Sequence, residues 1–350
     1  MMKIDQMVMA AAAMCASDIH LICGLPPKIR VDGVLTDLTS DVLTDEDCRK
    51  IAEKLAGEHY ASIRDIGELD MAASIGGERV RINLFHQRGH ISAALRILSN
   101  HIPEVEELGL PKVAEKFADY RKGIVLVTGE TGSGKSTTLA ALLNRINENR
   151  AEHIVTLEDP IEYLYEPKKS IINQREIGTD TRSYADGLRA ILREDPDVIL
   201  IGEMRDLTTI ETALTAAETG HLVFATLHTN SAVDSIDRMV GVFPEERQPQ
   251  IRMELSTTLN AVLSQQLLPR AGGKGRILAA EVMIVTTSIR NLIREGKTPQ
   301  MHSAMLTSAA EGSITMDNFL LQLVADRKIT PETAMQACND ADYMKKKFMF

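Results

Sequence analysis

Apolar and polar positions divide the chain into two regions with different patterns. From about residue 112 onward, short continuous apolar runs alternate with stretches whose apolar residues recur at helical spacing. Such runs are typical of strands buried on both faces, so the alternation predicts a mostly parallel sheet with helices on both sides. The runs occupy 124–127, 154–157, 198–201 and 222–226. After about residue 245 the pattern predicts mainly helices.

The first region, 1–98, mixes both periodicities. Residues 78–85 alternate apolar and polar side chains, which predicts a strand, and 91–98 is its expected antiparallel neighbour. Residues 44–55 predict a helix, because Thr44 is a good N-cap with an acidic residue three positions later. The N-terminal residues predict an amphipathic helix with methionine and alanine on its inner face. Together these elements indicate a small α+β domain.

The stretch 99–111 contains two prolines and several carboxylates, and it is the best candidate for a linker. We therefore expect an N-terminal domain over 1–98, a linker over 99–111 and an α/β domain over 112–350 that ends in a helical segment. A chain of 350 residues is too long for one compact core, which agrees with two domains.

Bulk composition excludes several classes of protein. An apolar content of 44% and a charged content of 25% are ordinary for a globular protein, and no apolar run approaches the roughly 18 residues needed to span a bilayer. A net charge of −10 argues against direct nucleic-acid binding as the main function. The four cysteines form no CxxC pair, so their spacing indicates neither a zinc site nor a disulfide framework, and it suits a reducing cytoplasm.

The strongest motif is GETGSGKST, which lies between the apolar run 124–127 and an apolar helical stretch at 139–143. This is the phosphate-binding pattern G-x-x-x-x-G-K-[ST] in its strand–turn–helix context, where backbone N–H groups and a helix N-terminus surround phosphate oxygens. Lys135 is expected to reach the β- and γ-phosphates, and Ser136 to ligate Mg²⁺. The predicted nucleotide-binding residues are Gly129, Thr131, Gly132, Ser133, Gly134, Lys135, Ser136 and Thr137.

Carboxylates follow two of the apolar runs, where a nucleotide site is expected. Glu158, Asp159 and Glu162 come after the second run, and Glu203 follows the third. Hydrolysis of a γ-phosphate needs a metal ligand and a group that orients water. The residue pattern alone leaves open whether Glu162 or Glu203 orients the water.

Histidines and arginines supply further candidates. His228 follows the fourth run and could sense a γ-phosphate, whereas His221 precedes that run and is as well explained by a structural role. The arginines near the end of the first domain are either a solvated sheet face or arginine fingers for a nucleotide on the other domain. These arginines are Arg79, Arg81, Arg88 and Arg96.

In combination, these motifs resemble the type II/IV secretion ATPases. The resemblance covers nearly the whole chain and rests on GETGSGKST, LEDPIEY (157–163), LREDPDVILIGEMRD (192–206), ETGHLVFATLHTNSAVDSIDRMVGVFP (218–244), ASDIHL (16–21) and GLPPKIRVDG (24–33). Within that family the chain is similar to the PilT-type retraction ATPases of twitching motility. It has no tetracysteine insertion, and SIRNLIRE at 288–295 differs from their signature AIRNLIRE only at Ser288.

The resemblance implies a RecA-like P-loop NTPase core with a small PAS-like N-terminal domain. It implies that Glu162 polarises the attacking water, that Glu203 acts on Mg²⁺ together with Ser136, and that His228 lies near the γ-phosphate. His221 is a less secure member of the same histidine group. Arg81 and Arg96 match the two arginines that reach the nucleotide from the N-terminal domain. Adenine is the expected base, because the chain also lacks an N-K-x-D guanine motif.

The implied function is that of an ATP-hydrolysing homohexamer that powers type IV pilus retraction. Such a motor would act on a platform protein of the inner membrane, in the cytoplasm and peripheral to that membrane. A pilus-extension or type II secretion assembly ATPase is the main alternative. A nucleotide-dependent regulatory protein with negligible turnover and, more distantly, a nucleic-acid translocase are the others.

Overall fold

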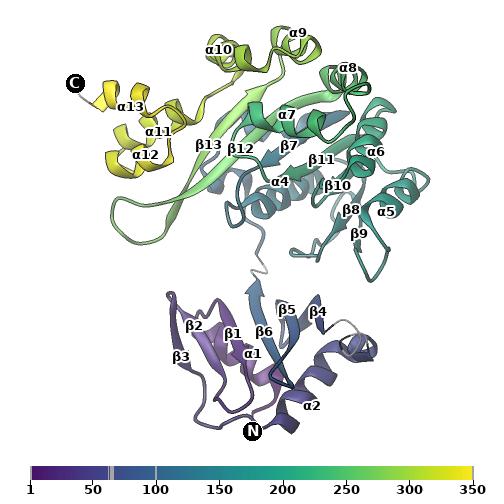
Figure 1. The fold of residues 1–350 in the computed structure, drawn as a ribbon, viewed down its shortest axis with the longest axis vertical. Coiled ribbons are helices and arrows are strands. Elements are labelled where there is room, and N and C mark those ends of the chain that lie inside the picture. Colours follow the sequence, from purple (N-terminus) through teal and green to yellow (C-terminus); the bar gives the residue numbers. More distant parts are fainter. Residues whose placement is uncertain (1, 62, 64–66, 99–100, 349–350) are drawn as a thin grey trace. The chain divides into compact units, whose positions relative to one another are not determined.

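The computed structural model describes residues 2–61, 63, 67–98 and 101–348. The chain forms two compact units, and each is described here by itself (Figure 1). One unit comprises Met1–Ile102 and Pro160–Leu164, and the other comprises Pro103–Asp159 and Tyr165–Phe350. The predicted linker, 99–111, begins on two residues outside the described part, and its bounds stay a prediction.

The first unit is built on a six-stranded antiparallel sheet in the order β3-β2-β1-β6-β5-β4. The expected hairpin is present, with Gln87 opposite His90 across a turn in which Arg88 and Gly89 both have positive φ. The strands are β1 Asp18–Leu21, β2 Lys28–Val31, β3 Val34–Asp37, β4 Glu68–Ile75, β5 Glu78–Gln87 and β6 His90–Leu98. The sequence analysis did not identify β3, whose residues are all exposed, or β4.

Among the described residues, α1 (Ile4–Ala13) and α2 (Asp45–Ala56) pack on this sheet, and a 3₁₀ turn, η1 (Gly57–His59), follows α2. α1 buries Met7 and Ala11 among other residues, as its amphipathic pattern predicted. The predicted cap of α2 is confirmed, because the Thr44 hydroxyl accepts the N–H of Asp47 at 3.2 Å. An ion pair between Lys54 and Asp5 joins the two helices.

The second unit contains a seven-stranded sheet in the order β13-β12-β7-β11-β10-β8-β9. Every neighbouring pair is parallel except β12 and β13, so the predicted mostly parallel α/β architecture is confirmed. The strands are β7 Gly123–Thr128, β8 His153–Glu158, β9 Ile171–Glu176, β10 Val198–Ile201, β11 Leu222–Leu227, β12 Leu259–Pro269 and β13 Arg276–Ile284.

The expectation of mainly helical structure after residue 245 is wrong in one respect. Residues 259–269 and 276–284 form the long hairpin β12–β13, which extends the sheet beside β7. β13 is almost entirely apolar, and β12 mixes apolar residues with buried polar ones such as Ser264 and Gln265, so neither shows the alternation that distinguishes a strand from a buried helix. β9 was also missed, because as an edge strand it carries few apolar residues.

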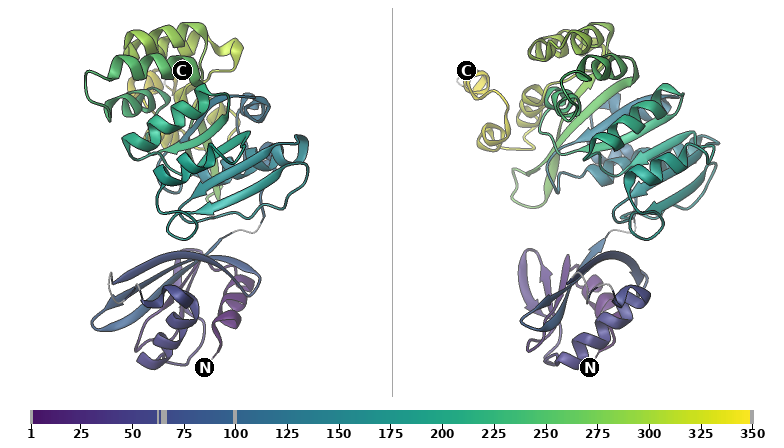
Figure 2. Two further views of the ribbon diagram at one scale, coloured as in Figure 1. Left: turned by 90° about the vertical axis from the view of Figure 1, so that its right-hand side faces the viewer. Right: turned by 45° about the vertical axis from the view of Figure 1, so that its right-hand side comes forward.

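Helices cover both faces of this sheet (Figures 1 and 2). One face packs against α4 and two 3₁₀ segments, η2 (Val105–Leu108) and η3 (Lys112–Asp119). The other packs against α5 to α10. The bounds are α4 Lys135–Asn149, α5 Tyr184–Ile191, α6 Leu207–Glu218, α7 Ala232–Gly241, α8 Gln248–Thr258, α9 Thr287–Glu295 and α10 Met301–Thr307.

The C-terminal helices α11 (Met316–Ala325), α12 (Pro331–Ala337) and α13 (Ala341–Phe348) form a separate apolar cluster with Leu268 and Ala279 of the β12–β13 hairpin. Figure 1 shows them beside that hairpin, in yellow. Two 3₁₀ turns, η4 (Thr298–Gln300) and η5 (Ala309–Glu311), flank α10. Within the described ranges, no helix combines the length and apolar character needed to cross a membrane.

A buried carboxylate on β13 connects two of these helices to the sheet. Glu281 is 2% exposed, and its two oxygens accept the N–H groups of Ala232 at 2.7 Å and Met316 at 3.2 Å. These residues begin α7 and α11, whose first N–H groups have no partner inside their own helices. Burial raises the pKa of Glu281, and the two N–H donors oppose that shift.

We expect Glu281→Gln to destabilise the second unit by about 1–3 kcal/mol, because the amide leaves one helix N–H facing another donor. The measurement is the urea midpoint of unfolding. Glu246→Gln, the same change at an exposed position, is the control and should leave the midpoint unchanged. Equal midpoints for the two variants would contradict this role of Glu281.

Candidate functional site

The predicted phosphate loop lies between a buried strand and a helix. All six residues of β7 are buried, and the loop leads directly into α4, which begins at Lys135. Gly132 and Gly134 have φ of 80° and 92°, a region that favours glycine. Gly129 has φ of 141°, and a Cβ atom there would lie 2.3 Å from the carbonyl oxygen of Gln265. The loop therefore requires glycine at these positions.

Lys135 points back into the loop. Its Nζ donates hydrogen bonds to the carbonyl oxygens of Gly129 at 2.7 Å and Glu130 at 2.9 Å. Burial lowers the pKa of Lys135, and the negative charge of Glu203 opposes the shift. Ser136, the predicted Mg²⁺ ligand, is exposed at the start of α4. A desolvated ammonium beside exposed loop positions fits a site for phosphate.

The parallel register aligns the ends of three strands with this loop. Leu227 of β11 pairs with Thr128 of β7, and Ala225 of β11 pairs with Ile201 of β10. Glu203 follows β10 by two residues, and His228 directly follows β11. Both side chains therefore belong to the sheet edge from which the loop departs, as expected for a parallel sheet.

Glu203 is the electrostatic centre of this edge. It forms an ion pair with Arg205 at 2.7 Å, and its Oε1 lies 3.5 Å from Nε2 of His228. Burial acts to raise the pKa of Glu203, but Arg205, His228 and Lys135 together lower it. The structure thus brings together Lys135, Glu203 and His228, three of the residues singled out in the sequence, around an ionised carboxylate.

The carboxylates Glu158, at the end of β8, and Glu162, just after it, have different surroundings. Glu158 accepts hydrogen bonds from Thr156 at 2.6 Å and Gln174 at 3.2 Å, which hold it at the end of the strand. Glu162 belongs instead to the segment Pro160–Leu164, which is part of the first unit. There Arg79 donates from Nε and Nη2 to the carbonyl oxygen of Ile161, at 3.1 and 2.9 Å. The catalytic role of Glu162 stays a prediction.

Arg81 and Arg96 lie opposite each other on β5 and β6. Arg81 forms an ion pair with Asp70, and Nε of Arg96 donates to Asp18 at 3.0 Å. Both guanidinium groups are substantially exposed. The sequence predicted the two strands but not this direct pairing, which gives one sheet face two adjacent cations. Their contact with nucleotide stays a prediction.

His221 is separated from the cluster around Glu203. It precedes β11, whereas His228 follows it, and six residues of extended strand span about 20 Å. The ring Nδ1 of His221 lies 2.8 Å from the carbonyl oxygen of Ala216 and 3.1 Å from the Thr219 hydroxyl. The two histidines therefore lie at opposite ends of β11, and the assignment of His221 to the group near the γ-phosphate stays a prediction.

Arg290 of the segment 288–295 also has a structural contact. Its Nη1 donates to the carbonyl oxygens of Ser256 at 2.7 Å and Thr257 at 3.1 Å. These carbonyls lie in the last turn of α8, where helical partners are missing. Arg290, which belongs to the signature segment 288–295, therefore links α9 to the end of α8.

Sequence reasoning missed Gln265 of β12, which supports the phosphate loop from outside the motif. Its side chain is 1% exposed, and Nε2 donates to the carbonyl oxygen of Ser133 at 2.8 Å. Among the described residues, the Ser133 hydroxyl is buried without a hydrogen-bond partner. The loop therefore has one buried polar group that can still form a hydrogen bond. No local signal marks Gln265, because it belongs to no recognised motif and lies 132 positions from Ser133.

Comparison with known proteins identifies the family of the chain. The family model described as type II/IV secretion system protein matches residues 1–319. The chain is 46% identical over 337 residues to the type IV pilus retraction ATPase PilT of Pseudomonas aeruginosa, covering 96% of this chain and 98% of that protein. It is 44% identical over 320 residues to a twitching motility protein of Neisseria gonorrhoeae, covering 91% and 86%.

A solved crystal structure of the pilus retraction motor PilT with bound ADP superimposes with a TM-score of 0.93 at 47% identity. The match covers 99% of this chain and 100% of that one, so both units have counterparts there. This likeness confirms the predicted α/β core with its smaller N-terminal unit. The chain therefore belongs to the type II/IV secretion system protein family, within its group of PilT-type retraction ATPases.

Proposed function

We propose that this chain is an ATP-hydrolysing motor subunit that powers the retraction of type IV pili. The observation that carries the proposal is the cluster of Lys135, Glu203 and His228 at one edge of a parallel sheet, beside a complete phosphate-binding loop. The near full-length similarity to retraction motors supports the choice of this activity over other reactions of nucleotides.

Nucleotide binding would use the loop from Gly129 to Thr137. Its backbone N–H groups and the start of α4 would surround the phosphates. Lys135 would exchange its bonds to the carbonyls of Gly129 and Glu130 for bonds to the β- and γ-phosphate oxygens, which would return the ammonium to a negatively charged environment. Mg²⁺ would neutralise charge on the phosphate oxygens. Ser136 would hold that ion, with Glu203 acting on it.

Hydrolysis needs a carboxylate that orients water and groups that respond to the γ-phosphate. Glu162 is proposed as the water-orienting base. Glu203 is already engaged by Arg205 and His228, which keep it ionised and suit it to a cation rather than to accepting a proton. His228 is placed to exchange its contact with Glu203 for one with the γ-phosphate. The charges around Glu203 support the proposal that Glu162, rather than Glu203, is the base.

Coupling to movement is proposed to depend on Arg81 and Arg96. Both are held by acidic side chains, and a nucleotide phosphate would compete with these for the guanidinium groups. In a homohexameric ring, gain and loss of such contacts at successive subunits would convert hydrolysis into movement. We propose that the ring acts in the cytoplasm at the inner membrane, on a platform protein that returns pilin to the bilayer.

We expect Lys135→Ala to lose ATP turnover by about 10²-fold or more, because no other side chain of the loop supplies a cation to the phosphates. Steady-state phosphate release measures this. Lys122→Ala, an exposed lysine just before β7, is the control. Normal hydrolysis by the Lys135 variant would show that the loop is not the catalytic nucleotide site.

Glu162→Gln should retain ATP binding but lose turnover, because the amide cannot accept a proton from water. Fluorescent-nucleotide binding and phosphate release, measured on the same preparation, separate the two effects. Glu166→Gln, an exposed carboxylate four positions later, should behave as the unmodified protein does. Undiminished turnover in Glu162→Gln would transfer the base role to another residue.

Deletion of the gene tests the direction of the motor. We expect cells with excess surface pili and no twitching, because extension continues without retraction. Electron microscopy and a motility assay are the measurements, with restoration by the unmodified gene and not by Lys135→Ala. Cells without pili would make the protein an extension motor, and unchanged pili and motility would contradict a required role in retraction.

A further inference from the structure

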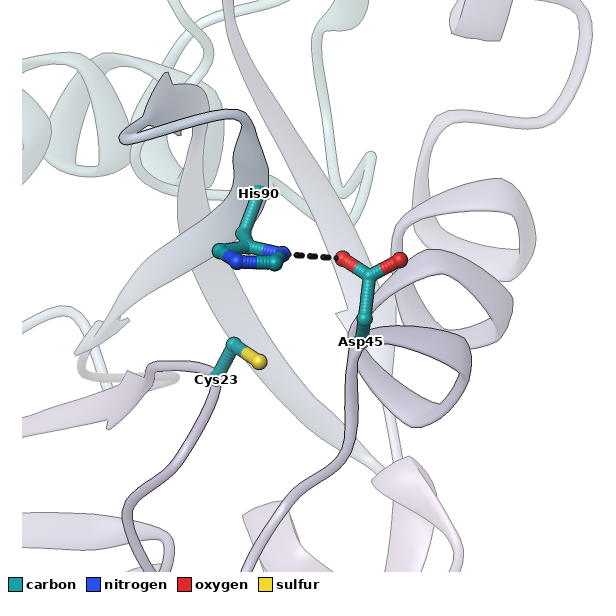
Figure 3. Close-up of side chains that lie close together, drawn as sticks. All are labelled: Cys23, Asp45 and His90. Carbon is teal, nitrogen blue, oxygen red and sulfur yellow. Dashed lines mark hydrogen bonds and ion pairs between the residues drawn. The ribbon is translucent and has the colours of Figure 1, made fainter.

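Three side chains with metal-binding chemistry meet in the first unit, in a site that shares no residue with the nucleotide loop. Cys23 lies just beyond β1, Asp45 begins α2, and His90 begins β6. One ligand atom from each side chain lies within 4.8 Å of the other two. Figure 3 shows the three side chains facing a common space, with the imidazole and the carboxylate in contact.

The backbone explains why residues so distant in sequence converge here. β1 pairs with β6 so that Leu21 lies opposite Ala93, and continuing this register brings Cys23 beside the start of β6, where His90 lies. The N–H of Gly24 donates to the carbonyl of Leu43 at 2.8 Å, which ties the Cys23 loop to the segment before α2. Backbone bonds thus position the site without help from the three side chains.

The start of α2 is also held in place. Thr44 caps the helix through Asp47, which fixes the first turn where Asp45 lies. The two oxygens of Asp45 have different partners: Oδ1 lies 2.7 Å from Nδ1 of His90, and Oδ2 accepts from Arg49 at 2.8 Å. Arg49 orients the carboxylate from its outer oxygen, as residues behind metal ligands commonly do.

We propose that Cys23, Asp45 and His90 bind a divalent transition metal ion, with Zn²⁺ as the natural occupant. Thiolate, imidazole and carboxylate together are a donor set for Zn²⁺ and Co²⁺, whereas Mg²⁺ and Ca²⁺ take oxygen ligands. Three protein ligands leave a fourth tetrahedral position for water.

The geometry requires only small movements. With Zn–N and Zn–O near 2.0–2.1 Å and Zn–S near 2.3 Å, neighbouring ligand atoms of a tetrahedral shell are about 3.3–3.7 Å apart. The His90–Asp45 contact at 2.7 Å must open by about 0.6 Å, because the metal replaces the shared proton. Separations of up to 4.8 Å to Cys23 must close by about 1 Å, within the reach of a side-chain rotation.

Cys48 is close in sequence to Asp45 but is a different kind of cysteine. It lies one turn further along α2 in the apolar core, and burial raises its pKa to about 11. It therefore remains a neutral thiol at neutral pH. Cys23 is only partly buried, and Asp45 and His90 are partly exposed as well.

A metal ion here would join the loop after β1, the N-terminus of α2 and the β5–β6 turn. These elements are already joined by backbone bonds, by apolar contacts and by the His90–Asp45 pair, and a bound ion would add a further link that stabilises the first unit against unfolding. The spacing of the cysteines indicated no zinc site, because the ligands come from three distant elements and only one of them is a cysteine.

The test is titration of the full-length, tag-free protein with Co²⁺ in a phosphine reductant, followed by absorbance. We expect one equivalent of Co²⁺ to produce a near-ultraviolet thiolate charge-transfer band and visible bands of tetrahedral intensity, which Zn²⁺ abolishes and excess Mg²⁺ does not. The Mg²⁺ arm separates this site from the nucleotide site, where no thiol is present.

Cys23→Ser should remove the charge-transfer band, and His90→Gln should weaken Co²⁺ binding at least about tenfold. Cys15→Ser, which removes an exposed thiol of the same unit, is the matched control and should keep both the band and the affinity. His90 is about half exposed, so its variant keeps the folded unit, and circular dichroism checks this. Absence of the band in the unmodified protein, or unchanged affinity in His90→Gln, would overturn the proposal.

Discussion

The second unit depends on the burial of β7 between β11 and β12. With every residue of the strand inside the core and parallel partners on both sides, the strand can end at only one place on the sheet edge. The phosphate loop therefore begins at that place, and Lys135 points back toward the carbonyl groups of Gly129 and Glu130. The same ladder carries the residues after β10 and β11 to this edge, so Glu203 and His228 arrive there through backbone pairing.

Charge then determines what this edge can do. Glu203 is surrounded by Arg205, His228 and Lys135, which outweigh the cost of burying its carboxylate. Lys135 is desolvated and is compensated by carbonyl oxygens and by the more distant Glu203. Lys135 and Glu203 can exchange these contacts for ones with a phosphate or a cation at little cost in solvation, because both groups are already largely removed from bulk water.

Much of this arrangement could be predicted from the sequence, because it is local or follows from strand order. The phosphate loop is contiguous, and a parallel sheet assigns residues that follow strands to one edge, which located Glu203 and His228. The same rule places His221, which precedes its strand, at the opposite edge of the sheet. Gln265 could not be found in this way, because its partner lies on another element and its neighbours give no sign that their segment is a strand.

The first unit shows the same limit. The cap at Thr44 and the β5–β6 hairpin are local, and both were predicted. The pairing of Arg81 with Arg96 needs the exact hairpin register, and the meeting of Cys23, Asp45 and His90 needs two strand pairings and a loop contact at once. A short sequence motif cannot predict that these three side chains lie together, because no fixed spacing along the chain connects them.

The hydrogen bond from Gln265 to Ser133 sets a limit on how far this protein can be shortened. Every recognised nucleotide motif ends at or before residue 244, so a fragment that stops there would contain all of the motifs. It would lack β12, and with it the strand that pairs with β7, the carbonyl packed against Gly129 and the amide that holds the loop. The smallest folding unit for nucleotide binding is therefore larger than the span of its motifs.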